Sequence, residues 1–114
     1  MGRMGIQPGK WLQFTIDDQP CEAQVKTVVW RGDDRDLASA GKEPWHDLLI
    51  VTTAEGSILI RRRLIDPHFG RDDTVSWHLT DSPERAAPLL DPANSVERRA
   101  LMELGWWKNV ARRV

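Results

Sequence analysis

Three consecutive arginines, Arg61, Arg62 and Arg63, form the longest run of like charge in the sequence. Clustered guanidinium groups can bind phosphate oxygens, and an outward Trp11 or His78 would offer a ring for base stacking. These five residues, with the arginines near the C-terminus, are therefore the candidate nucleic-acid site. The structural alternative is a strand that leaves the core or lies at a sheet edge, because charge on both faces prevents sheet-to-sheet pairing.

Carboxylates gather in the run Asp33-Asp34-Arg35-Asp36. Calcium prefers such ligands, but the run lacks the alternating carboxylates, the central glycine and the terminal glutamate of an EF-hand loop. We therefore expect a solvated loop and predict no metal site. This run and Asp72-Asp73 are also possible partners for the arginine run.

Acid–base or nucleophilic chemistry would have to use His46, His68, His78 or the single cysteine, Cys21. No Cys or His pair has zinc-site spacing, and no phosphate-binding, dinucleotide-binding or serine-hydrolase motif occurs. We therefore predict no catalytic residue and no cofactor. A small enzyme or ligand-binding barrel remains the third hypothesis, with the three histidines as the first positions to mutate. A concave pocket holding two histidines beside carboxylates would favour it.

Met102, Trp106 and Val110 recur every four residues, so a helix would place them on one face, with Arg99 and Arg113 on either side. A tryptophan among methionine and arginine side chains has the composition of an interface hot spot. The alternative is a helix buried on two sides, or arginine stems that cover Trp106.

Residues 31–46 are polar and rich in Gly, Asp and Ala, which predicts a loop longer than is usual in a compact domain. Pro44 fixes the backbone before Trp45, which either pins the loop to the body or faces a partner. The predicted partner-binding residues are Arg99, Met102, Trp106, Val110, Arg113 and Trp45.

Alternating or continuous apolar residues predict five β-strands over residues 11–16, 21–30, 47–53, 57–65 and 74–80. Turn-forming residues at 17–20 and 54–57 predict two hairpins. The run Val28-Val29-Trp30 breaks the alternation and predicts a bulge or burial on both faces. In the last strand, Val75, Trp77 and Leu79 are expected to point inward.

Three prolines in residues 81–94 predict an extended connector, and residues 95–113 then follow a helical pattern that Asn94 or Ser95 can cap. Gly105 costs about 1 kcal/mol inside a helix and would alternatively end a first helix. We favour one helix, because an apolar stripe keeps its phase across the glycine: Val96, Ala100, Leu104, Trp107, Ala111 and Val114. This arrangement predicts that Trp107 is buried against the sheet and that Trp106 is exposed.

The elements predict a mainly β (α+β) fold. Residues 1–114 are expected to form one domain, with strands over 10–80, the connector and a C-terminal helix packed on the sheet. The expected architecture is a five-stranded antiparallel small barrel or curled sheet, for which SH3-like and OB-like domains are the nearest shapes.

Composition limits the function classes. With 16 basic and 17 acidic residues the net charge is −1, so no overall field favours nucleic acid or a membrane. A single cysteine excludes an internal disulfide, and no apolar run approaches the roughly 18 residues of a membrane span, so we expect a cytoplasmic protein.

The first functional hypothesis is a non-enzymatic interaction module, either an accessory or inhibitor subunit or a homodimer. It would bind a protein through the C-terminal helix face and the 31–46 loop. Nucleic-acid binding is the second hypothesis.

Overall fold

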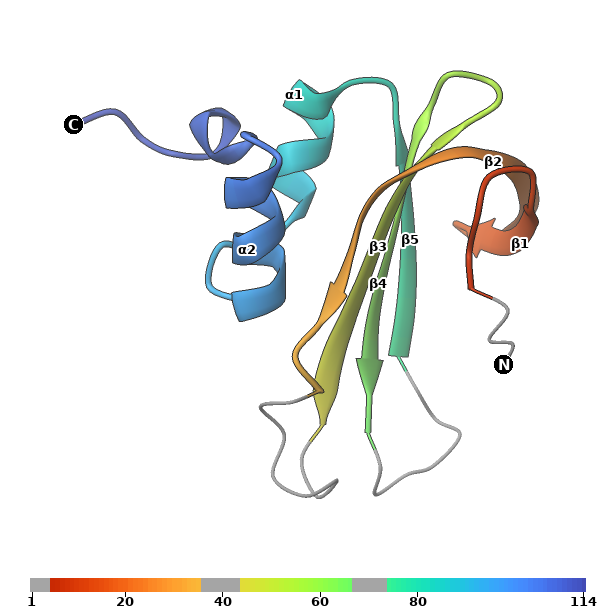
Figure 1. Cartoon of the computed structure of the whole chain (residues 1–114), viewed down its shortest axis with the longest axis horizontal. Helices are drawn as coiled ribbons and strands as arrows, with labels where there is room; N and C mark the ends of the chain where they lie inside the picture. The colour runs from red at the N-terminus through yellow and green to blue at the C-terminus, as the bar shows by residue number, and fades with distance from the viewer. Residues whose placement is uncertain (1–4, 36–43, 67–73) are drawn as a thin grey trace.

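The computed structural model describes residues 5–35, 44–66 and 74–114 of the chain. A curled antiparallel sheet lies beside a small helical layer (Figure 1). The strands pair in chain order: β1 (Trp11–Ile16), β2 (Gln19–Asp33), β3 (Trp45–Thr53), β4 (Ile58–Ile65) and β5 (Thr74–Thr80). The predicted fold class is confirmed: five antiparallel strands form a curled half-barrel, with a short C-terminal helix.

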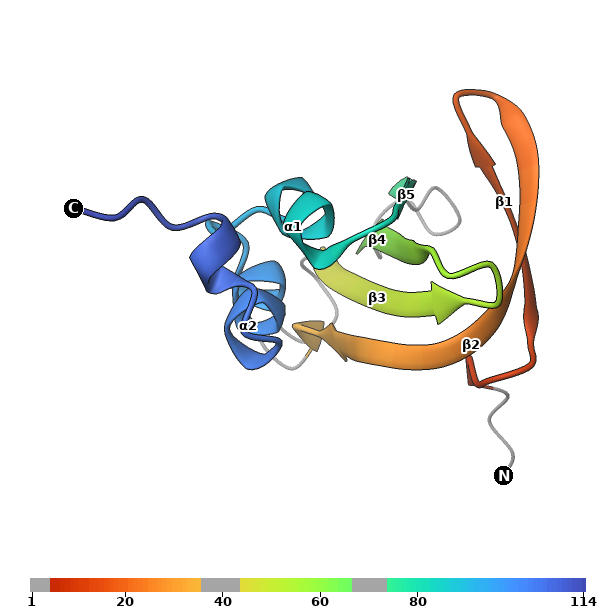
Figure 2. The ribbon, with the colours of Figure 1, turned by 90° about the horizontal axis from the view of Figure 1, so that it is seen from above.

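The curl of the sheet comes from β2. Its first half pairs with β1 and its second half with β3, and the register shifts between Val25 and Thr27 and again between Val28 and Trp30. Such irregularities bend a strand and increase its twist, so the predicted bulge at residues 28–30 is confirmed. As a result, β1 and the start of β2 turn across one face of the sheet (Figure 2).

Alternation along β3 and β4 gives the sheet two buried faces. Leu48, Ile50 and Ile60 point to the convex face, where the helices pack. Leu49, Val51 and Leu59 point to the concave face, where β1 and β2 cover them with Leu12, Phe14, Ala23 and Val25. The near-continuous apolar sequence of β3 therefore reflects burial on both sides.

Strand β5 has the expected alternation, but its concave-face side chains are less covered than those of β3 and β4. Trp77 lies on the concave face, but Val75 and Leu79 on the same face are 43% and 49% exposed. The reason is position: β5 is the last strand of the sheet, and the β1 side chain Phe14 stacks on Trp77. Val75, Trp77 and Leu79 therefore share the concave face, as predicted, but Val75 and Leu79 remain about half exposed there.

The segment after the sheet is helical rather than extended. It forms α1 (Pro83–Ala86) and a 3-10 turn, η2 (Ala87–Leu89), and Ser82 caps α1 by accepting from the Arg85 backbone N–H. Pro83 occupies a first-turn position, which proline tolerates because the backbone N–H there needs no helical partner. Ala86, Ala87 and Leu90 are buried in the convex-face core, which favours the compact form over the predicted extended connector.

The C-terminal helix ends earlier than predicted. Helix α2 spans Ser95–Glu103, with Asn94 as its N-cap, and a 3-10 turn, η3 (Trp107–Asn109), follows. Gly105 has a φ of +73°, and the backbone N–H groups of Gly105 and Trp106 donate to the carbonyls of Met102 and Leu101. This is the Schellman pattern of a helix end, so the hypothesis of one helix over 95–113 is wrong.

The helix end buries Trp106, which was predicted to be exposed, while Trp107 packs only in part against the same core cluster. Trp106 follows the reversed glycine, is 8% exposed and lies in the same core cluster as Leu101. Trp107 is half-buried, with the Arg98 guanidinium 5.7 Å from its ring centroid. Val114 is fully exposed, so the apolar stripe does not continue past the glycine.

The predicted long loop is shorter than 31–46. Residues 31–33 belong to β2 and residues 45–46 to β3, while residues 36–43 lie outside the described part of the chain.

Across the described ranges, no helix has the length and apolar character that crossing a membrane requires.

Candidate binding surface at the open edge of the sheet

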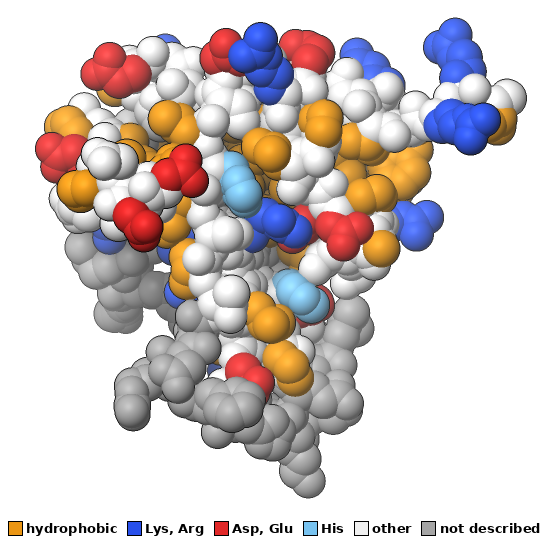
Figure 3. Space-filling model, turned by 180° about the vertical axis from the view of Figure 1, so that it is seen from behind, with side chains coloured by type: hydrophobic (Ala, Val, Ile, Leu, Met, Phe, Trp, Pro, Cys, Tyr) orange, Lys and Arg blue, Asp and Glu red, His pale blue; other side chains and the backbone are white. Residues whose placement is uncertain are grey.

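Strand β5 lies at one end of the sheet, and no described strand pairs with its outer side. Among the described strands, β5 pairs with β4 alone, so its second side, here called the open edge, presents unpaired backbone groups. Its sequence, Thr-Val-Ser-Trp-His-Leu-Thr, holds no Lys, Arg, Asp, Glu or Pro. Because β5 lies behind β3 and β4 in Figure 1, the view from behind in Figure 3 looks towards this side of the sheet, with the β1–β2 hairpin on one side and the helices on the other.

A groove lies on the concave side of the open edge. The rings of Phe14 and Trp77 stack there at 4.9 Å between centroids and 22° between planes. The groove has a volume of about 650 Å³, and its walls include Gln13, Phe14, Thr15, Cys21, Glu22 and Trp77. We call this the seam groove, because it lies where the two end strands of the half-barrel, β1 and β5, approach each other. The stacked rings of Phe14 and Trp77 form part of its wall.

A polar cleft lies on the convex side of the sheet. It has a volume of about 300 Å³ between the sheet surface and the start of α2, and its walls include His46, Arg62, Thr74, Ser76, Asn94 and Glu97. Histidine, arginine and acidic side chains gather in this region of the rear face (Figure 3). The open edge thus separates a largely apolar groove from a cleft rich in hydrogen-bonding groups.

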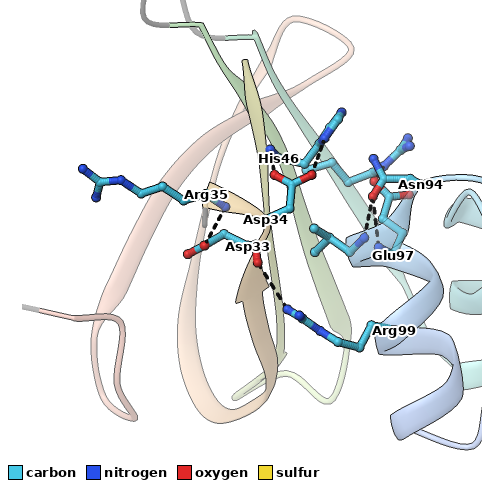
Figure 4. Close-up of polar contacts among 9 residues, drawn as sticks. Asp33, Asp34, Arg35, His46, Asn94, Glu97 and Arg99 are labelled. Atoms are coloured by element: carbon cyan, nitrogen blue, oxygen red, sulfur yellow. Dashed lines mark hydrogen bonds and ion pairs between the residues drawn. The ribbon is translucent and has the colours of Figure 1, made fainter. Parts of the chain in front are cut away.

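His46 is held in place by Asp34 (Figure 4). The two Asp34 oxygens contact the His46 backbone N–H at 2.6 Å and its Nδ1 at 3.1 Å. The His46 side chain is 43% exposed, and Asp34 is 16% exposed. A carboxylate that orients an imidazole fixes the ring nitrogen that faces outward, which suits proton transfer or hydrogen bonding to a ligand.

Glu97 joins α2 to the sheet inside the polar cleft. One of its carboxylate oxygens accepts from Arg62 Nε at 3.0 Å, and the other accepts from the Asp91 backbone N–H at 2.7 Å. Asn94 caps the helix by accepting from the backbone N–H groups of Val96 and Glu97 (Figure 4). Glu97 is 5% exposed, and its two hydrogen bonds satisfy a charge that would otherwise be costly to bury.

His78 lies on β5, one strand from Arg62. Its Nε2 is buried without a hydrogen-bond partner in the structure. Burial lowers the pKa of His78, the positive charge of Arg62 lowers the pKa further, and Glu97 opposes the shift. The ring is therefore held towards its neutral form.

The arginine run is paired with carboxylates inside the chain. On the concave face, Arg61 and Arg63 contact the same Asp47 oxygen at 3.0 and 3.5 Å. Asp47 is 5% exposed. Burial lowers the pKa of Arg61, and the negative charge of Asp47 opposes this shift. Because β4 lies between β3 and β5, the interpretation of this run as part of an edge strand is wrong.

Arg99 fastens α2 to the end of β2. Its guanidinium lies 5.4 Å from the Trp30 ring centroid and donates to the Asp33 carbonyl at 3.3 Å, while Trp30 Nε1 donates to Glu103. Gly32 permits this packing, since a Cβ there would lie 2.5 Å from the Trp30 ring and 2.7 Å from Arg99.

The predicted helix patch is not assembled as one exposed face. Trp106 is buried, Met102 is 59% exposed, and Val110 is half-buried beyond the end of the helix. Arg113 is exposed in the C-terminal segment. The physical reason is the reversal at Gly105, which removes the four-residue spacing from Met102 onward.

The remaining predicted site residues lie on separate elements. Trp45 is half-buried at the start of β3, where the Arg35 guanidinium lies 5.4 Å from its ring centroid. Trp11 is 52% exposed on β1 and His78 is on β5. His68, Asp36, Asp72 and Asp73 lie outside the described residues. Within residues 5–35, 44–66 and 74–114, no group of three or more His, Cys, Asp or Glu side chains could hold a metal ion.

Comparisons with protein-family models, with curated proteins and with solved structures found no match to this chain.

The open edge was missed at the level of sequence, although one signal was present. Residues 74–80 carry no charge in a chain whose residues are 29% charged, and the same holds for residues 11–16, which form β1 at the other end of the sheet. An uncharged strand is ordinary in the middle of a sheet and unusual at an edge, so this signal gains meaning once β5 is known to be the last strand.

Proposed function

We propose that this chain is a non-enzymatic interaction module that binds an extended segment of a protein along the open edge of β5. The observation that carries the proposal is the seven-residue uncharged edge itself. Natural sheets usually protect such edges with Lys, Pro, bulges or covering elements, because unpaired backbone groups invite another strand. The described residues of β5 include none of these protections on the open side.

The surroundings of the edge support strand addition. Side chains of an added strand alternate between the two faces of the sheet. On one side they would meet the seam groove with Phe14 and Trp77, and on the other the polar cleft with Arg62 and Ser76. Backbone hydrogen bonds would provide affinity, and these two sides would select alternating apolar and polar residues.

The test uses a displayed library of random linear peptides, selected on the folded chain at a low chain concentration. Enriched peptides should alternate apolar and polar residues. Their affinity should fall by about tenfold or more for Val75→Lys, because a lysine at the edge opposes strand pairing. Met102→Lys is the matched control, since Met102 is also an exposed apolar residue, at 59% against 43% for Val75, but lies on α2.

Two outcomes would count against the proposal. One is enrichment of peptides that bind wild type and Val75→Lys equally, which places binding elsewhere. The other is a selection that yields no peptide above background.

Ligand binding or a small enzymatic activity at the polar cleft is the second candidate function. It is favoured by one observation: His46 is oriented by Asp34 at a cleft that also contains Glu97 and Asp91. Of the two histidines sought beside carboxylates, His46 lines this cleft, and His78 interacts electrostatically with Arg62 and Glu97. Nucleic-acid binding has less geometric support, because each arginine of the run already contacts a carboxylate.

A further inference from the structure

We infer that the extended segment bound at the open edge is β5 of a second copy of this chain, so that two copies join their sheets about a two-fold axis. The inference rests on the proposed function and names the partner. Strand β5 can pair with itself in a register that brings like side chains together, and it carries no charged residue.

The register follows from the exposed apolar residues. In an antiparallel pair centred on Trp77, Val75 of one copy lies opposite Leu79 of the other, and the same contact occurs a second time by symmetry. These are the two large apolar side chains that β5 leaves about half exposed in the single chain. Directly opposed apolar residues are the contacts that stabilise antiparallel strands, so pairing would cover surface that the monomer leaves in water.

The polar face of the strand matches itself in the same register. Ser76 of one copy lies opposite His78 of the other, so a hydroxyl faces an imidazole, and Thr74 faces Thr80. All four side chains occupy the cleft side of β5, whereas Val75, Trp77 and Leu79 occupy the groove side. In this one register, apolar side chains lie opposite apolar side chains on one face of the paired strands, and polar side chains lie opposite polar side chains on the other.

Charge does not oppose the contact. Neither copy places a charged residue within the seven positions of the strand, and the net charge of the chain is −1. Because the same patch serves both copies, the contact closes after two chains, which is the commonest arrangement of soluble homo-oligomers.

Sedimentation equilibrium over micromolar to millimolar chain concentration tests the inference. Wild type should show a reversible monomer–dimer equilibrium. Val75→Lys and Leu79→Glu should each raise the dimer dissociation constant by about tenfold or more, because each places two charges against apolar side chains. Met102→Lys should dimerise like wild type.

Mixing Val75→Lys with Leu79→Glu tests the register. In a mixed pair the introduced lysine of one copy lies opposite the introduced glutamate of the other, and the second contact keeps the native Leu79 and Val75. Mixing should therefore give heterodimers with a lower dissociation constant than the homodimer of either variant. Both positions are about half exposed, and thermal unfolding of each variant verifies that the fold is retained.

Three results would overturn the inference: wild type that stays monomeric throughout, variants that dimerise like wild type, or a mixture that forms no heterodimer. If the library peptides still bind in a Val75-dependent manner, the proposed function stands and the partner is a different protein. If neither dimers nor such peptides are found, both proposals fail.

Discussion

His78 shows how one side chain can carry opposing constraints. Its ring lies beside Arg62 on β4 and within reach of the charge of Glu97 on α2, and its buried Nε2 has no hydrogen-bond partner. Protonation would add a second positive charge next to Arg62 in a partly desolvated place. The chain therefore stabilises the neutral ring, and this preference links folding to pH.

The free energy of unfolding should fall as the pH falls through the His78 titration. The folded pKa lies below the ordinary value of 6.5, so the unfolded chain takes up the proton first. Stability from this residue is thus present above about pH 6.5 and is lost between that value and the lower folded pKa. His78→Gln should flatten this part of the profile, as measured by urea unfolding at a series of pH values.

An NMR titration of the His78 imidazole provides the independent check. A folded-state pKa at or above the ordinary value would contradict the prediction, as would a His78→Gln profile that keeps the full slope.

At the scale of elements, the end of α2 depends on the left-handed backbone conformation of Gly105. Its φ of +73° is accessible to glycine and costs other residues roughly 1 kcal/mol or more. A Cβ at this position meets no atom within 4 Å, so backbone strain is the cost that remains. Gly105→Ala should lower the free energy of unfolding by about 1 kcal/mol, and Gly105→Asn by less, because asparagine tolerates this conformation better.

The sign of that change separates two structures. In one continuous helix over 95–113, alanine would be the better helix former and would raise stability by a similar amount. Urea unfolding of wild type and both variants decides the matter; a more stable Gly105→Ala would contradict the helix end described above.

The strands were predictable because alternation is a local property. Residues 11–16 and 74–80 alternate in sequence and form β1 and β5 with the same bounds. The helix end was not predictable from the apolar stripe, because the stripe continues across Gly105 whether or not the chain reverses there. The reversal combines the left-handed conformation of Gly105 with the burial of Trp106 in the cluster that contains Leu101, and the stripe indicates neither.

The candidate site was less predictable than the fold. Each arginine of residues 61–63 meets a carboxylate that no local pattern indicates: Asp47 lies on the neighbouring strand and Glu97 lies 35 residues from Arg62 on a helix. The open edge depends on which strand ends the sheet. Strand order is set by packing of the whole chain, and the alternation within residues 74–80 is the same in a central strand and an edge strand.

At the scale of the molecule, two apolar clusters share the same two strands. Leu48 and Ile50 support the helical layer, while Leu49 and Val51 support the β1–β2 hairpin on the other face. Losing β3 and β4 would therefore destroy both clusters at once. We expect one cooperative unfolding transition, with coincident urea curves from tryptophan fluorescence and far-ultraviolet circular dichroism.

Separate transitions would show that one layer unfolds while the other persists. Glu97→Gln is a useful variant here, because it weakens the link between α2 and β4 without touching the concave cluster. Under the shared-strand arrangement it shifts both curves together to lower urea concentration, whereas independent layers would split the unfolding into two transitions, of which only the one from the helical layer shifts.

The uncharged edge of β5 also affects the tendency of the protein to aggregate in a crowded solution. A strand with free backbone groups and no charged gatekeeper is a site where partly unfolded chains can stack into aggregates. An isologous pair would remove that hazard, because each copy hides the other's edge and the assembly cannot grow further through it. The same seven residues would then determine whether the chain remains dispersed during heating or synthesis, so a lysine there trades pairing for colloidal stability.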